Sequence, residues 1–124
     1  DFGDLLTTVR GGGSNSNTTR GILGGGRTPT QVNTIQFITF TTTGDSVDFG
    51  DLTAPRFEIV GLGSPTRAVF AGGAQEPISP AIIDRIDYVE IMTTGNAVDF
   101  GNLTYTTGQG RQPTGGSNGH GGLS

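Results

Sequence analysis

The amino-acid sequence repeats itself, and this repetition limits more than any other feature what the chain can fold into. Asp1–Leu5 returns as Asp48–Leu52 and again as Asp99–Leu103, where Asn102 replaces the second aspartate. The copies start 47 and 51 residues apart. Self-similarity with a period of this length is typical of proteins whose units stack on their neighbours.

Two further matches extend the repeat over the whole chain. Thr19–Gly26 corresponds to Thr66–Gly73, and Ser117–Leu123 aligns with Ser64–Phe70 and begins a third copy. We therefore divide the chain into the end of a preceding unit (1–5), a first unit (6–53), a second unit (54–104) and the Gly-rich start of a third unit (105–124). We expect a fragment or a processed product that closes by pairing with further units.

Each unit has the pattern of several short β-strands. In the second unit, Phe57–Val60, Arg67–Ala71 and Ile86–Met92 are β-prone runs, with turn residues at 61–65 and a proline-bearing loop at 74–83. Gly95 and Asn96 then form a hairpin turn before Ala97–Phe100. The sequence therefore predicts an all-β chain with four strands in each unit.

The third strand of each unit carries apolar side chains on both faces. Ile35 and Phe37 point one way, whereas Ile38 and Phe40 point the other way. Such a strand is covered on both sides. Stacked four-stranded sheets satisfy this requirement, and radial stacking gives a β-propeller, here an incomplete one. An open stack that polymerises end to end is the alternative architecture.

Charge and composition disfavour several classes of partner. Seven arginines, no lysine and eleven acidic residues give a net charge of -4, so we expect no nucleic-acid partner, which needs a basic stripe. Without cysteine the chain forms neither a disulfide nor a thiolate metal site. No apolar run is long enough to span a membrane and no signal peptide is visible, so we expect no membrane partner.

The second unit resembles a kelch-type blade. Arg67–Gly73, a proline-bearing loop and Ile86–Val89 follow the order of such a blade, in which the second strand ends in Gly-Gly and the third follows a variable loop. The chain departs from the kelch pattern because it has no tryptophan after its tyrosine. The resemblance implies kelch-like β-propeller blades built from four-stranded antiparallel sheets.

A closer resemblance covers essentially the whole chain. Thr93–Thr104, Thr19–Gly26 and Ser117–Leu123 are similar to the tandem kelch-like repeats of large proteins of marine tailed phages and cyanophages. This resemblance implies a virion component, associated with a tail or a fibre, with a structural or host-contact role. It implies a location in the virion or outside the cell.

The repeated residues are best interpreted as structural anchors. Asp-Phe-Gly also occurs in kinases, but a kinase needs a lysine and a His-Arg-Asp loop, which the chain lacks. We expect its phenylalanine to anchor against the next sheet and its glycine to bend the strand end or to let backbones approach closely. The predicted anchors are Phe2, Phe49, Phe100, Arg20, Arg67, Asp48, Asp99, Gly25 and Gly72.

Charged side chains at repeated positions also favour structural roles. Arg20 and Arg67 share one position, which His120 occupies in the third copy, and we expect these arginines to pair with Asp48 or Asp51. The repeated aspartates are a weaker candidate for Ca²⁺, because Asn102 removes one carboxylate; capping of backbone amides is their expected use.

The sequence predicts a non-enzymatic module without cofactors. His120 is the sole histidine, and no arrangement of Ser, His and Asp supports catalysis. We expect a structural or adhesive part of a virion or extracellular assembly. Its expected partners are other repeats of a longer chain, identical copies or other virion proteins. The alternative is a lectin-like propeller that binds host surface glycans through Arg27, Gln75, Glu76 and Arg111.

Overall fold

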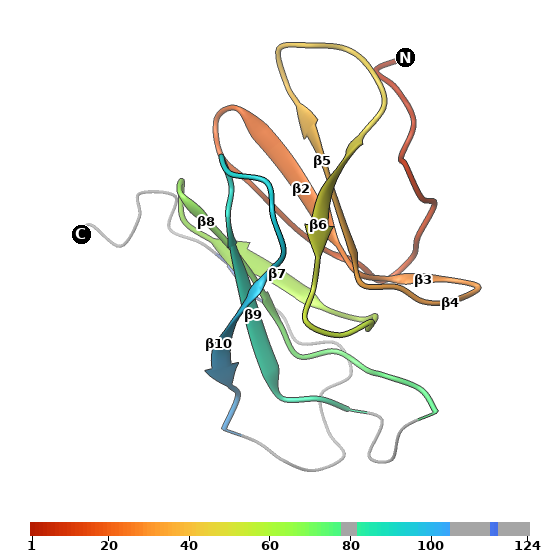
Figure 1. Ribbon diagram of the computed structural model, residues 1–124, viewed down its shortest axis with the longest axis vertical. Helices are drawn as coiled ribbons and strands as arrows, with labels where there is room; N and C mark the ends of the chain where they lie inside the picture. Colours follow the sequence, from red (N-terminus) through yellow and green to blue (C-terminus); the bar gives the residue numbers. More distant parts are fainter. Residues whose placement is uncertain (78–81, 105–114, 117–124) are drawn as a thin grey trace.

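Two four-stranded antiparallel sheets form most of the protein (Figure 1). The computed structural model describes residues 1–77, 82–104 and 115–116. The first sheet has the order β1-β2-β5-β6 and contains β1 (Gly13–Ser16), β2 (Arg20–Gly24), β5 (Thr34–Thr39) and β6 (Val47–Asp51). The second has the order β10-β9-β8-β7 and contains β7 (Val60–Gly63), β8 (Arg67–Ala71), β9 (Arg85–Glu90) and β10 (Val98–Asn102). A small ribbon pairs β3 (Arg27–Thr28) with β4 (Thr30–Gln31).

The expected all-β class and the four strands in each unit are confirmed. Each sheet is a chain of antiparallel neighbours, and the two sheets share the same irregularity. The register of β5 with β6 shifts between Ile35 and Gln36, opposite Phe49, and that of β9 with β10 shifts between Asp99 and Gly101. A bulge of this kind re-aims the side chain it contains.

Two predicted turns are wrong. Gly95 and Asn96 were expected to form a two-residue hairpin loop, but strand β9 ends at Glu90 and β10 begins at Val98, so residues 91–97 connect the two strands. Residues 61–65 were expected to form a turn, but Val60–Gly63 is strand β7, and the reversal follows at 64–66. Gly61 lies in the strand because β1 packs directly on it: an ideal Cβ on Gly61 would overlap the backbone of Ser14. A glycine inside a strand marks such a close approach of two backbones.

The hydrophobic core lies between the two sheets. Ile22, Ile35 and Phe49 from the first sheet meet Phe70 and Val89 from the second, all of them buried. The backbones of the sheets come closest where β1 faces β7 and β8, with Cα atoms within 8 Å. The third strand of the second unit is therefore covered by the first sheet on one of its faces.

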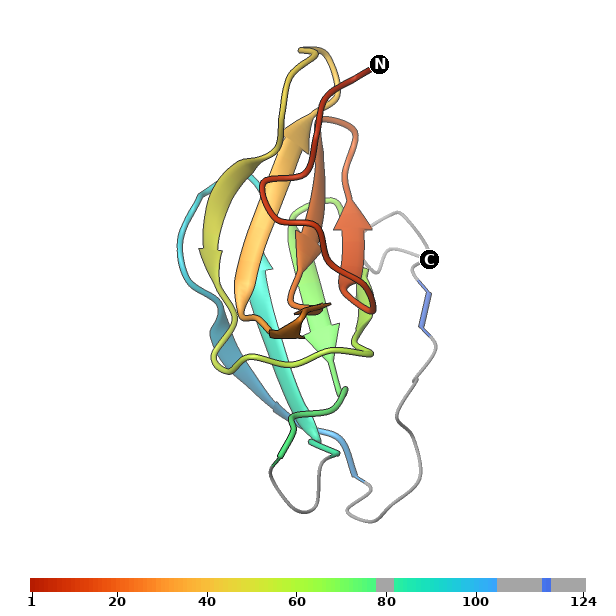
Figure 2. The same cartoon turned by 90° about the vertical axis from the view of Figure 1, so that its right-hand side faces the viewer.

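The N-terminal segment forms a further layer on the outer face of the first sheet. Figure 2 shows it crossing in front of this sheet, with the second sheet behind. The Leu6 N–H donates to Ser46 Oγ at 2.7 Å, and Gln36 Nε2 donates to the Thr7 carbonyl at 3.1 Å. The first sheet thus lies between the N-terminal segment and the second sheet.

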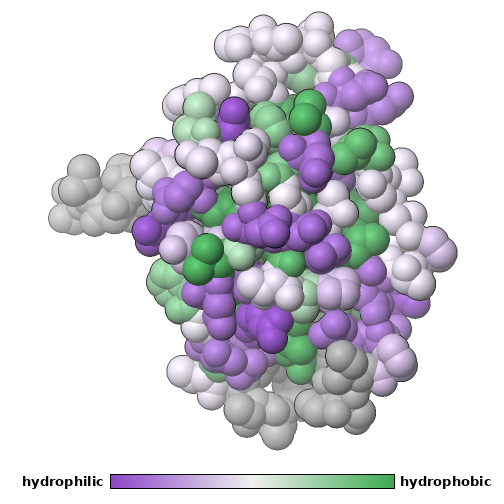
Figure 3. All heavy atoms as spheres, in the orientation of Figure 1, coloured by the Kyte–Doolittle hydropathy of each residue, from purple (hydrophilic) through white to green (hydrophobic). Residues whose placement is uncertain are grey.

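The surface seen in Figure 3 mixes hydrophobic and hydrophilic residues and shows no single continuous apolar area. None of the residues that the structure describes belongs to a helix long and apolar enough to cross a membrane.

Candidate functional site

The end of one unit binds the hairpin turn of the next through its backbone. The Gly44 N–H donates to the Phe2 carbonyl at 2.8 Å, and the Ser46 N–H donates to the Asp4 carbonyl at 2.9 Å. The Asp4 N–H in turn donates to Asp45 Oδ1 at 2.9 Å. Three hydrogen bonds thus join an Asp-Phe-Gly segment to a Thr-Thr-Gly turn, and we name this arrangement the turn joint.

The same turn joint recurs between the first and the second unit. The Gly95 N–H donates to the Phe49 carbonyl and the Ala97 N–H to the Asp51 carbonyl, both at 2.8 Å. The Asp51 N–H donates to Asn96 Oδ1 at 3.1 Å. Because β6 is an edge strand of its sheet, the joint also pairs backbone groups that would otherwise face outward.

The glycine of Asp-Phe-Gly is required by this geometry. Gly3 and Gly50 have φ values of +152° and +147°, which disfavour residues with a side chain. An ideal Cβ on Gly3 would overlap the carbonyl oxygen of Gly44, and one on Gly50 would overlap that of Gly95. The close backbone approach expected from the sequence is therefore present at both joints.

The three repeated phenylalanines lie in different surroundings. Phe49 is 3% exposed and meets the Phe37 ring edge-on, with centroids 5.7 Å apart. Phe100 makes the equivalent contact with Tyr88 at 5.9 Å, yet it is 59% exposed, and Phe2 is 38% exposed. Phe49 belongs to the buried core between the two sheets, whereas Phe2 and Phe100 are exposed.

The expected pairing of the repeated arginines with Asp48 or Asp51 is wrong in the described part of the chain. Arg67 Nε donates to Glu90 Oε1 at 2.7 Å, because β8 and β9 place these two residues directly opposite each other. Arg20 Nη1 instead reaches the Ile91 carbonyl of the next unit at 3.0 Å.

Both arginine side chains lie over an aromatic ring of the neighbouring strand. The Arg20 guanidinium is 4.5 Å from the centroid of Phe37, and that of Arg67 is 4.7 Å from the centroid of Tyr88. A guanidinium in this position is attracted to the face of the ring. His120, the third member of this repeated position, lies outside the described residues.

Three of the four remaining anchors, Asp99, Gly25 and Gly72, form hydrogen bonds with the backbone. Asp99 Oδ1 accepts a hydrogen bond from the Gly101 N–H at 2.8 Å, which is the capping role expected for such aspartates. The Gly25 N–H donates to the Thr34 carbonyl and the Gly72 N–H to the Arg85 carbonyl at equivalent places in the two units. Asp48 is exposed. In residues 1–77, 82–104 and 115–116, no three His, Cys, Asp or Glu side chains gather as metal ligands would.

Sequence reasoning missed a fully buried ion pair beneath the second sheet. Arg56 Nη2 donates to Asp87 Oδ2 at 3.0 Å, and neither side chain is exposed. The guanidinium also donates to the carbonyls of Gly72, Arg85 and Phe70 at 2.9–3.1 Å. Burial lowers the pKa of Arg56, and the nearby Asp87 carboxylate opposes this effect. The guanidinium therefore ties the loop that enters the second unit to strands β8 and β9.

Asp87 occupies a position that clamps the preceding segment in both units. Its carboxylate accepts hydrogen bonds from the N–H and the Oγ1 of Thr53. At the equivalent place in the first unit, Gln36 is buried and bonds to the backbone of Thr7. A polar residue inside an apolar strand, repeated as Gln36 and Asp87, is the sequence signal that would have revealed this clamp.

The predicted ligand loop is only partly assembled. Arg27 Nη1 and Glu76 Oε2 form an ion pair at 3.0 Å, and Gln31 Nε2 donates to the Glu76 carbonyl. Arg27 also lies 5.1 Å from the centroid of the Phe57 ring. Gln75 is half-buried beside Glu76, and Arg111 lies outside the described residues. Two of the four residues therefore meet, and their charges are directed at each other.

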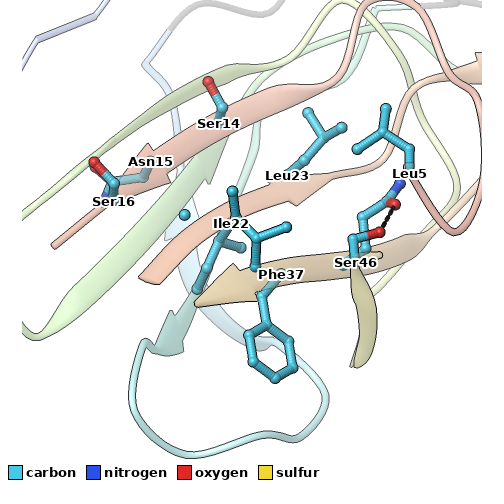
Figure 4. A pocket seen from close by; sticks show the side chains of 11 residues that line it. Leu5, Ser14, Asn15, Ser16, Ile22, Leu23, Phe37 and Ser46 are labelled. Atoms are coloured by element: carbon cyan, nitrogen blue, oxygen red, sulfur yellow. Dashed lines mark hydrogen bonds between the residues drawn. The ribbon is translucent and has the colours of Figure 1, made fainter. Parts of the chain in front are cut away.

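A groove of about 490 Å³ lies on the outer face of the first sheet. Figure 4 shows Leu5, Leu23 and Ser14 on one side of the strands, with the Phe37 ring on the opposite side. Gln36 and Ser46 close one part of the groove through a 2.7 Å hydrogen bond. The lining residues carry no charge, so the groove is suited to packing against an uncharged surface.

No protein-family model matches the chain, and no curated protein is significantly similar to it.

Proposed function

We propose that the chain is a structural or adhesive module of a virion or extracellular assembly, in which repeated β-sheet units pack with further units. The turn joint carries this proposal. It occurs at two successive boundaries with the same three hydrogen bonds, so one unit is built to hold the next. Repeat proteins gain stability from such nearest-neighbour interfaces.

The arrangement of the sheets supports kelch-like propeller blades as the form of packing. Close backbone approach is concentrated at β1, β7 and β8, where glycines replace larger side chains. At the other side of the sheets, contact between the units passes through the turn joint at β6. Two sheets whose backbones approach closely at their first strands, and which contact each other through a turn at their last strands, suit a radial arrangement.

The strongly held charges support a structural role. The Arg56 guanidinium binds three backbone carbonyls and one carboxylate, and Arg20 binds a carbonyl of the next unit. In both cases the charge fixes one segment of the chain on another. In a catalytic site, by contrast, a charged group faces the substrate.

Native mass spectrometry and small-angle scattering of the intact chain, together with a glycan array, test the proposed function. We expect defined assemblies of several units, from this chain alone or with its assembly partners, and no reproducible glycan binding. A chain that stays monomeric in the presence of those partners and binds one defined glycan would contradict the structural role.

A glycan-binding module is the second candidate. It is favoured by the cluster of Arg27, Gln31 and Glu76, which presents charged and amide groups from both units at one place. Arg27→Ala is expected to abolish binding on a glycan array if this cluster is the site. Arg67→Ala is the matched control, because Arg67 also forms an exposed ion pair but lies on β8.

A further inference from the structure

We propose that the Asp99–Asn102 segment of β10 is a third turn joint, and that its partner is the Thr-Thr-Gly turn of a further repeat of this type. The inference rests on the proposed function and specifies it, because it names the surface, the partner segment and the direction in which units are added. The Asp-Phe-Gly segments at residues 1–4 and 48–51 each receive the turn of the unit that follows them.

The backbone of this segment already has the shape of the two occupied joints. Gly101 has a φ of +141°, close to the +152° of Gly3 and the +147° of Gly50. The bulge opposite Phe49 is repeated at Phe100. The segment is therefore preorganised, which reduces the entropy cost of binding.

The surface around Gly101 is uncovered in the described structure. An ideal Cβ on Gly101 has nothing within 4 Å, whereas one on Gly50 would overlap the turn of the second unit. Phe100 is 59% exposed and Phe49 is 3% exposed, although both follow the same sequence pattern. The difference matches the presence of a following unit beside Phe49.

The outward face of the second sheet continues this surface. Val69 and Ile86 are half-buried there, whereas their counterparts Ile22 and Ile35 are buried under the second sheet. A further sheet would cover Val69 and Ile86 in the same way. The apolar face and the turn joint lie on the same side of the unit, so one partner engages both.

The hydrogen-bonding groups select the partner. The two occupied joints use the carbonyl of the phenylalanine, then the N–H and the carbonyl of the residue after glycine. In the third copy these groups belong to Phe100 and Asn102. They match a turn that offers two backbone N–H groups and a side-chain oxygen between them, as Gly95, Asn96 and Ala97 do.

An extended chain tests this assignment. Residue 124 aligns with residue 71, so a copy of residues 72–104 appended after Ser124 completes the third unit. Hydrogen exchange is measured at the amides of Asn102 and Asp51 in the 124-residue chain and in the extended chain. We expect the Asn102 amide to exchange at least about tenfold more slowly in the extended chain, as an opening equilibrium then protects it.

Two variants of the extended chain separate the joint from general stabilisation. Asn96→Leu in the added copy removes the side-chain acceptor, and Gly101→Val blocks the approach of the added turn. Both are expected to return Asn102 to the exchange rate of the 124-residue chain. The Asp51 amide, which lies in the existing joint, is expected to stay protected in both variants.

The Asp51 amide also separates failure of this inference from failure of the proposed function. If Asp51 is protected and Asn102 is not slowed by the extension, the third joint is overturned, whether or not the added unit folds. The third joint is also overturned if the extension slows exchange at the Asn102 amide and this slowing is still present in both variants. If Asp51 itself exchanges freely in the 124-residue chain, the joints do not hold units together and the proposed function fails.

Discussion

The guanidinium of Arg56 and the carboxylate of Asp87 form a 3.0 Å ion pair in which neither side chain is exposed. A buried charge that loses its partner is strongly destabilising, because the remaining charge is neither solvated nor neutralised. We expect Asp87→Asn to lower the free energy of unfolding by about 3–5 kcal/mol. Urea denaturation followed by circular dichroism measures this change.

The first unit supplies the control for this substitution. Val9 and Gln36 occupy the positions that correspond to Arg56 and Asp87. The double variant Arg56→Val with Asp87→Gln copies the first unit and leaves no buried charge, so it is expected to lose less stability than Asp87→Asn alone. If Asp87→Asn is as stable as the parent chain, the ion pair with Arg56 does not contribute to the free energy of unfolding.

Gly50→Ala is expected to loosen the turn joint. The new Cβ would overlap the carbonyl oxygen of Gly95, and the φ of +147° is unfavourable for alanine. Gly101→Ala has a similar φ of +141° and meets nothing within 4 Å, so it reports the backbone strain alone. We expect Gly50→Ala to be less stable than Gly101→Ala by about 1–3 kcal/mol in thermal unfolding, the usual cost of overpacking.

Equal losses from Gly50→Ala and Gly101→Ala would contradict the close contact with Gly95. In that case the glycine would be needed only for its backbone conformation.

Phe49 and Phe100 are expected to differ sharply on truncation to alanine. Phe49 is buried between the sheets, and its removal leaves a cavity that costs about 3–5 kcal/mol. Phe100 is exposed and keeps one edge-on contact with Tyr88, so its loss is expected to cost about 0.5–1.5 kcal/mol. Chemical denaturation of the two variants measures both values, and similar losses would show that burial does not distinguish the two copies.

The strand content of the chain could be predicted from sequence because the repeat aligns equivalent runs. Apolar residues on both faces of the third strand indicated that neighbouring sheets cover it. Ile35 is buried beneath the second sheet, whereas Phe40, expected on the other face, is exposed. The glycine at position 61 misled the prediction, since glycine in a sequence signals either a turn or a close backbone contact. Only the position of Ser14 distinguishes the two.

The polar contacts were harder to predict for a physical reason. Arg56 has no arginine counterpart in the first unit, so the repeat does not identify it as a structural residue. The partner of Arg67 follows from strand register, which a shift of one residue would change. Charge pairing between strands therefore needs coordinates, whereas the close backbone approach at the glycine of Asp-Phe-Gly was expected from three copies of one motif.

The two repeated arginines are expected to contribute unequally to stability. Arg20 donates to the Ile91 carbonyl of the next unit, so Arg20→Met removes a hydrogen bond between units and leaves that carbonyl without this donor. We expect a loss of about 1–2 kcal/mol, which combines the hydrogen bond with the stacking over Phe37. Arg67→Met removes an exposed pair with Glu90 and an exposed contact over Tyr88 but no contact with the next unit, so it is expected to lose less stability than Arg20→Met. Differential scanning calorimetry at low and high salt checks both variants. A larger loss at Arg67 than at Arg20 would show that pairing within a sheet, rather than contact between units, sets the stability of this chain.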